Sequence, residues 1–106
     1  MESEHRHAPR YQFIAEAEVT EISSNTNLTA KTSDLSLCGC FLDMLNPLPN
    51  GVDVRVRISH KGVTFTILGR VVFVLPNMGM GVEFRRIEDD QLTILREWIS
   101  KLTRAE

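Results

Sequence analysis

The sequence predicts an all-β fold with a C-terminal helix, in which six to seven strands form a small antiparallel barrel and the helix packs at one mouth. Three observations support this fold class. Apolar and polar residues alternate along several short segments, which is typical of strands with one buried face. Turn-forming Gly, Pro and Asn residues separate these segments. The last segment follows helical spacing instead. We expect a single domain over residues 1–106, with the barrel in residues 11–86 and the helix in residues 88–103.

The first predicted strand begins at Phe13, where apolar residues alternate with polar ones over residues 13–22. The polar loop of residues 23–27 then turns the chain, and a return strand follows over residues 28–37. We expect these two strands to form a hairpin.

The position of this loop sets the expected register of the hairpin. Pairing across residues 23–27 gives partners whose numbers sum to about fifty. Phe13 then lies opposite Leu37, and Arg10 projects toward residues 38–40.

The later strands are separated by turns that contain Gly, Pro or Asn. They are predicted over residues 40–42, 52–58, 63–67, 70–75 and 80–84. Residues 70–75 include an almost continuous β-branched and apolar run, so we expect this strand to be covered on both sides.

The final segment has apolar residues at the intervals of an amphipathic helix. These residues are Leu92, Leu95, Ile99 and Leu102. Asp89 or Glu88 can cap the start of the helix. Trp98 lies beside the apolar face, and we expect it to pack against the core or as a lid rather than to stack on a base.

The composition argues against several classes of protein. The hydrophobic fraction of 42% and the charged fraction of 25% are those of an ordinary globular protein. A net charge of -2 argues against a DNA- or RNA-binding protein, which usually displays a strong positive excess. The sequence has neither a signal peptide nor an apolar run of membrane-spanning length. We therefore expect a cytoplasmic protein without membrane insertion.

The titratable residues do not predict an enzyme or a metal site. His60 lies in a predicted hairpin turn, and no motif places a nucleophile and a carboxylate around it. The spacings of His5 and His7, and of Cys38 and Cys40, match no common zinc pattern. We expect the cysteines to be reduced thiols and the protein to need no cofactor.

One polar motif follows the return strand of the hairpin. Asp34 and Ser36 are two residues apart, so their side chains leave the same face of an extended strand. Gly39 permits a bend or a close backbone approach that a side chain would block. The motif thus presents a carboxylate and a hydroxyl beside a point where the ladder breaks.

A second polar motif precedes the first strand. Arg6 and Arg10 lie on an arm of residues 1–10 that has no hydrophobic period, and we expect this arm to be flexible. The hairpin brings the arm toward Asp34. Guanidinium groups bind phosphate and the O6 and N7 atoms of guanine, and a carboxylate can accept guanine N–H groups. The two motifs together suit a ligand with phosphates and base edges.

In order and spacing, the two motifs resemble the paired signature of the PilZ domain, a small β-barrel receptor for the bacterial second messenger cyclic di-GMP. Residues 81–84 and the helical tail also resemble the end of this family. The resemblance implies that cyclic di-GMP is the ligand. The implied ligand-binding residues are Arg6, His7, Arg10, Asp34, Ser36 and Gly39. His7 stands where many members have a second basic residue, so the charge there depends on pH.

Two functions are compatible with this resemblance. In the first, the arm becomes ordered over cyclic di-GMP and so changes the surface shown to a downstream protein, as in the control of motility or biofilm formation. In the second, the domain is a PilZ-like protein-interaction module that works without nucleotide. The sequence leaves open the partner, the oligomeric state and whether one ligand or a stacked pair binds.

Overall fold

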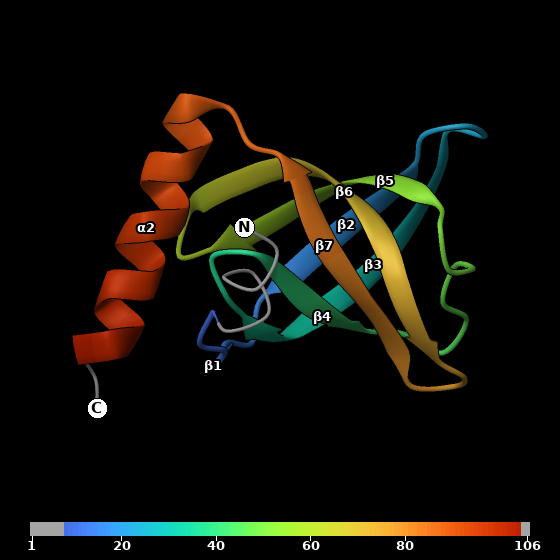
Figure 1. The fold of residues 1–106 in the computed structure, drawn as a ribbon, viewed down its shortest axis with the longest axis horizontal. Helices are drawn as coiled ribbons and strands as arrows, with labels where there is room; N and C mark the ends of the chain where they lie inside the picture. Colours follow the sequence, from blue (N-terminus) through green and yellow to red (C-terminus); the bar gives the residue numbers. More distant parts are fainter. Residues whose placement is uncertain (1–7, 105–106) are drawn as a thin grey trace.

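The computed structural model describes residues 8–104, which form seven strands and one helix (Figure 1). The elements are β1 (Tyr11–Gln12), β2 (Glu16–Glu21), β3 (Thr26–Leu35), β4 (Gly39–Asp43), β5 (Asp53–His60), β6 (Val63–Leu75), β7 (Gly79–Arg86) and α2 (Asp89–Arg104). All strand pairs are antiparallel, in the order β1-β3-β2-β5-β6-β7-β4, and β4 pairs with β3 to close a six-stranded barrel. The predicted barrel with a C-terminal helix is confirmed.

The barrel interior is filled by the inward-facing residues of its strands. Val54, Val56 and Ile58 of β5 are fully buried and alternate with exposed polar residues, as the sequence pattern predicts. Phe65 of β6 and Leu35 of β3 are also fully buried in this core.

Helix α2 closes one end of the barrel, and Figure 1 shows it beside β1 and the start of β6. Leu95 is fully buried. The Trp98 ring lies 5.2 Å from the Phe13 ring, 5.8 Å from that of His60 and 5.9 Å from that of Phe65. Trp98 therefore packs against the core, as predicted.

The start of α2 also covers part of the β6 edge. The side-chain oxygen of Gln91 accepts a hydrogen bond of 2.7 Å from the backbone N–H of Thr66, which lies beyond the end of the β6–β7 ladder. Within residues 8–104, no helix has the length and apolar character needed to cross a membrane.

The predicted register of the first hairpin is wrong. Partner numbers in β2 and β3 sum to 47, as in Glu16 opposite Lys31. The reason is the turn: Asn25 adopts a left-handed φ of 60°, and its N–H donates to the Glu21 carbonyl at 2.7 Å. The chain therefore reverses earlier than expected, and Phe13 pairs with Ser33 rather than Leu37.

The prediction for residues 63–67 and 70–75 is also wrong in two respects. They belong to one long strand, β6, which curves around the barrel (Figure 1). A bulge between Val71 and Phe73 turns Val72 and Phe73 outward, and each remains 38% exposed. Among residues 8–104, the outer face of this part of the barrel stays partly exposed, so the apolar run is fully buried on one side only.

Candidate functional site

A β-bulge turns Asp34 toward the outside of the barrel. The β3–β4 ladder shifts register between Thr32 and Asp34. Thr32 and Leu35 are both buried although they are three residues apart, so the alternation of inward and outward residues inverts at this bulge. Asp34 is therefore left partly exposed on the outer surface.

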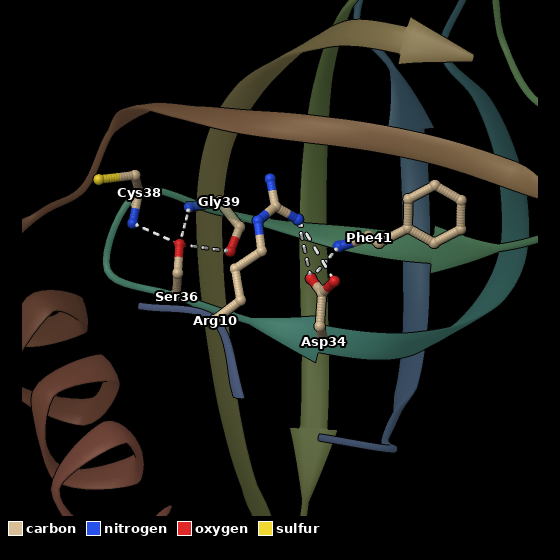
Figure 2. Close-up of polar contacts among 6 residues, drawn as sticks. All are labelled: Arg10, Asp34, Ser36, Cys38, Gly39 and Phe41. Atoms are coloured by element: carbon tan, nitrogen blue, oxygen red, sulfur yellow. Dashed lines mark hydrogen bonds and ion pairs between the residues drawn. The ribbon is translucent and has the colours of Figure 1, made fainter. Parts of the chain in front are cut away.

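Two groups hold the Asp34 carboxylate (Figure 2). The backbone N–H of Phe41 donates to Oδ1 at 3.1 Å, and Nη1 of Arg10 lies 3.3 Å from both carboxylate oxygens. The Arg10 side chain is 54% exposed, and exposed ion pairs contribute only about 0–1 kcal/mol. Arg10 can thus turn toward a ligand at little energetic cost, while the Phe41 amide keeps Asp34 in place.

The Ser36 hydroxyl is held inside a tight turn. It accepts hydrogen bonds from the backbone N–H groups of Cys38 at 3.0 Å and Gly39 at 3.1 Å, as Figure 2 shows. The Ser36 N–H donates to the Gly39 carbonyl at 2.9 Å. Ser36 is only 5% exposed, so its direct role is to shape this turn.

Gly39 allows β4 and β7 to approach closely. A Cβ atom at this position would lie 2.3 Å from the Val82 carbonyl oxygen, which is a backbone atom that cannot easily move. The Phe84 N–H donates to the Cys38 carbonyl at 2.8 Å and continues the same pairing. This is the close approach that the sequence predicts for Gly39.

Arg10, Ser36 and Gly39 line a depression of about 360 Å³, which is within the usual range for small-molecule sites, and Asp34 is linked to it through its contact with Arg10. Its lining residues are Ala8, Arg10, Ser36, Cys38, Gly39, Val72, Phe73, Gly81, Val82 and Glu83. The structure thus brings Arg10, Asp34, Ser36 and Gly39 to one region of the surface. The predictions for Arg6 and His7 fall outside the described residues.

The sequence did not identify the apolar side of this depression. The Phe73 ring stacks on the Phe41 ring, with centroids 5.8 Å apart and an interplanar angle of 26°. It lies over Gly81, where a Cβ atom would come within 2.2 Å of the ring. The only signal for this arrangement is the glycine at position 81, because the bulge that exposes Phe73 leaves no mark in the alternation.

Burial disfavours the ionised form of the two cysteines near the motif. Burial raises the pKa of the Cys40 thiol to about 12, and the negative charge of Asp34 adds to this effect. Burial also raises the pKa of Cys38, as does Glu83, whereas Arg10 acts in the opposite direction. Neutral thiols are poor metal ligands and nucleophiles. Among residues 8–104, no three His, Cys, Asp or Glu side chains are grouped to hold a metal ion.

Comparisons with known proteins identify the family and the fold of the chain. The model of the PilZ domain family matches residues 4–101. The solved PilZ domain of CeSA from a cellulose-synthesizing bacterium superposes with a TM-score of 0.71 at 20% identity, covering 90% of this chain and 98% of the other. The PilZ domain of YcgR from Escherichia coli, solved with c-di-GMP, gives a TM-score of 0.76 at 15% identity, with coverages of 94% and 92%.

A third solved structure is the inhibitor of motility MotI (DgrA) from Bacillus subtilis, with a TM-score of 0.78 at 12% identity. The match covers 95% of this chain and 52% of MotI. At these identities the structural matches establish the fold. None of the curated proteins matches the chain.

Proposed function

This chain belongs to the PilZ domain family, and on that premise we propose that it is a receptor for cyclic di-GMP that transmits ligand binding to a protein partner. The observation that carries the proposal is the meeting of Arg10 and Asp34 beside the turn of Ser36 and Gly39, at the edge of a depression of about 360 Å³.

The charges and shapes around the depression suit the parts of this dinucleotide. The exposed guanidinium of Arg10 can bind a phosphate or the O6 and N7 atoms of guanine. Asp34 is held in place by the Phe41 amide and can accept guanine N–H groups. The Gly39 turn forms part of the wall of the depression, and Phe73 adds an apolar ring to its lining. A planar base with a charged phosphate matches this combination.

The proposal also assigns Arg6 and His7 to the ligand. His7 directly precedes Ala8 and Arg6 precedes His7, and both Ala8 and Arg10 line the depression. When the arm closes over cyclic di-GMP, the surface next to the site changes, and a partner can recognise that change. Binding, rather than catalysis, is then the role of the domain. Relatives described as c-di-GMP-bound YcgR and as an inhibitor of motility support a role in bacterial signalling, and we place that role in the cytoplasm.

Isothermal titration of cyclic di-GMP into the parent chain and into Arg10→Ala tests the proposal. A lost charge-assisted hydrogen bond weakens binding by about 1.5–3 kcal/mol, or roughly tenfold to hundredfold. Arg10→Lys should restore only part of this loss, because an ammonium lacks the guanidinium fork.

Arg57→Ala is a matched control for this experiment. Arg57 contacts Glu18 through Nη1 at 3.3 Å and its side chain is 55% exposed, so its contact distance and exposure match those of Arg10. Both variants should keep the parental free energy of unfolding within about 0.5 kcal/mol. If the parent releases no binding heat, the nucleotide-independent interaction module takes the place of this proposal. If Arg10→Ala binds like Arg57→Ala, the site has been assigned to the wrong residues.

A further inference from the structure

A second depression lies on the outer surface of the barrel and contains three arginines. Its volume is about 310 Å³, and we call it the arginine groove. Its lining residues are Ile22, Asp53, Val54, Leu68, Gly69, Arg70, Arg85 and Arg86. None of these residues lines the depression beside Arg10, so the arginine groove is a separate site.

A bulge gathers the arginines on one surface. In the β6–β7 ladder Leu68 pairs with Arg86 and Gly69 pairs with Phe84, so Arg85 is an extra residue on β7. Such a bulge re-aims side chains, and here the consecutive residues Arg85 and Arg86 both line the groove. Alternation along a regular strand would have sent one of them to the interior.

The groove lining includes apolar side chains that are partly open to solvent. Leu68 is 37% exposed and Ile22 is 44% exposed. Leu68 lies opposite Arg55 on one neighbouring strand and opposite Arg86 on the other. An exposed leucine is thus set between guanidinium-bearing positions, an arrangement that offers both a hydrophobic contact and charge.

The arginines keep donor groups for a ligand. Arg70 contacts Asp53 at 2.7 Å, Arg85 contacts Glu83 at 3.0 Å and Arg86 contacts Glu88 at 3.8 Å. Each of these contacts is made through Nε, whereas most guanidinium N–H donors are on the Nη atoms. The three side chains are between 43% and 74% exposed, so the Nη groups can reach a bound molecule.

We propose that the arginine groove is a docking site for an acidic protein segment that carries an apolar anchor residue. Carboxylates of the segment bind the guanidinium forks of Arg70, Arg85 and Arg86, and the anchor packs on Leu68 and Ile22. A nucleic acid fits less well, because a phosphate backbone offers no aliphatic anchor for Leu68 and Ile22. The inference does not depend on cyclic di-GMP binding.

The groove is also next to the depression beside Arg10. Glu83 lines that depression, and its carboxylate contacts Arg85 of the groove. A partner bound in the arginine groove would therefore lie close to a ligand bound near Arg10. This position suits the output surface of a receptor.

Fluorescence anisotropy with a short labelled peptide tests the proposal. The probe carries Glu and Asp residues on both sides of a central Leu, and two further probes replace that Leu by Ser or all the acidic residues by Gln. An oligothymidine probe tests nucleic acid binding. We expect saturable binding of the first probe to the parent chain and at least tenfold weaker binding of the other three.

Three variants locate the binding. Arg86→Glu and Leu68→Ser should each weaken the first probe at least fivefold, whereas Arg57→Glu should not, because Arg57 lies outside the groove lining. Melting curves show whether each variant is folded, and Arg86 is 74% exposed, so its replacement leaves the core intact. The proposal is overturned if the first probe does not bind the parent, if Arg57→Glu weakens it as much as Arg86→Glu, or if the Ser-containing probe or oligothymidine binds equally well.

Discussion

Replacing Ser36 by Ala should lower stability, because the Ser36 hydroxyl organises the turn before β4. It accepts the backbone N–H groups of Cys38 and Gly39 at 3.0 and 3.1 Å, in a residue that is 5% exposed. The alanine variant leaves these donors without their acceptor. A buried donor that loses its partner costs about 1–3 kcal/mol. Since Cys38 is partly exposed and its N–H can turn to water, we assign the cost to one donor rather than two.

Thermal unfolding followed by circular dichroism measures this cost. For a domain of this size, 1 kcal/mol corresponds to a shift in Tm of about 4–8 °C, so Ser36→Ala should melt at least ~4 °C below the parent. Ser23→Ala is the matched control, because the Ser23 hydroxyl is exposed and donates only to Glu21, at 3.3 Å. Its stability should change by less than about 0.5 kcal/mol.

The same two variants should be titrated with cyclic di-GMP below their melting temperatures. If Ser36→Ala melts like Ser23→Ala but no longer binds the ligand, the hydroxyl contacts the ligand directly. The assignment of Ser36 as a residue that builds the turn would then be wrong.

Four further predictions concern the turn, the ligand, the arm and pH. Gly39→Ala should lower the free energy of unfolding by about 1–3 kcal/mol, because the new Cβ would lie 2.3 Å from the Val82 carbonyl oxygen. An unchanged melting curve would show that β4 and β7 separate easily. If Asp34 and the arginines recognise guanine edges, cyclic di-AMP should bind at least about 1–3 kcal/mol more weakly than cyclic di-GMP in the same titration. Equal affinity for the two dinucleotides would mean that only the phosphates are recognised. Hydrogen exchange from Ala8 to Phe13 should slow with saturating ligand, and identical rates would count against closure of the arm. Burial, Lys61 and Lys101 lower the pKa of His60 in the folded chain. The unfolded chain therefore binds the proton more readily, and Tm should fall as the pH drops below about 6.5. His60→Gln should reduce this dependence of Tm on pH.

The strands and helix were predictable where burial is one-sided and regular. Val54, Val56 and Ile58 alternate with charged residues because only one face of β5 meets the core. Gly39 was predictable as a point of close approach because only glycine tolerates it. These signals belong to individual residues or to a simple period.

Features that depend on one extra residue were not predictable. The bulges between Thr32 and Asp34 and between Val71 and Phe73 change which face each following residue occupies. The left-handed conformation of Asn25 shifts the first hairpin in the same way. Such changes depend on how each strand pairs with its neighbour and on the backbone of the turn, and the alternation of apolar and polar residues does not report them. The outward position of Phe73 therefore emerged only from the structure.

A titration of isotope-labelled chain with cyclic di-GMP, followed by the amide NMR signals, tests most directly whether the two motifs form one ligand site. The amides of Phe41 and Gly39 donate to the side chains of Asp34 and Ser36, so they report on both halves of the second motif. We predict saturable shifts of these two amides and of Arg10, with little change at Thr20 and Asn27 near the far end of the hairpin. Saturable shifts that leave Phe41, Gly39 and Arg10 unaffected, or no shifts at all, would contradict the account.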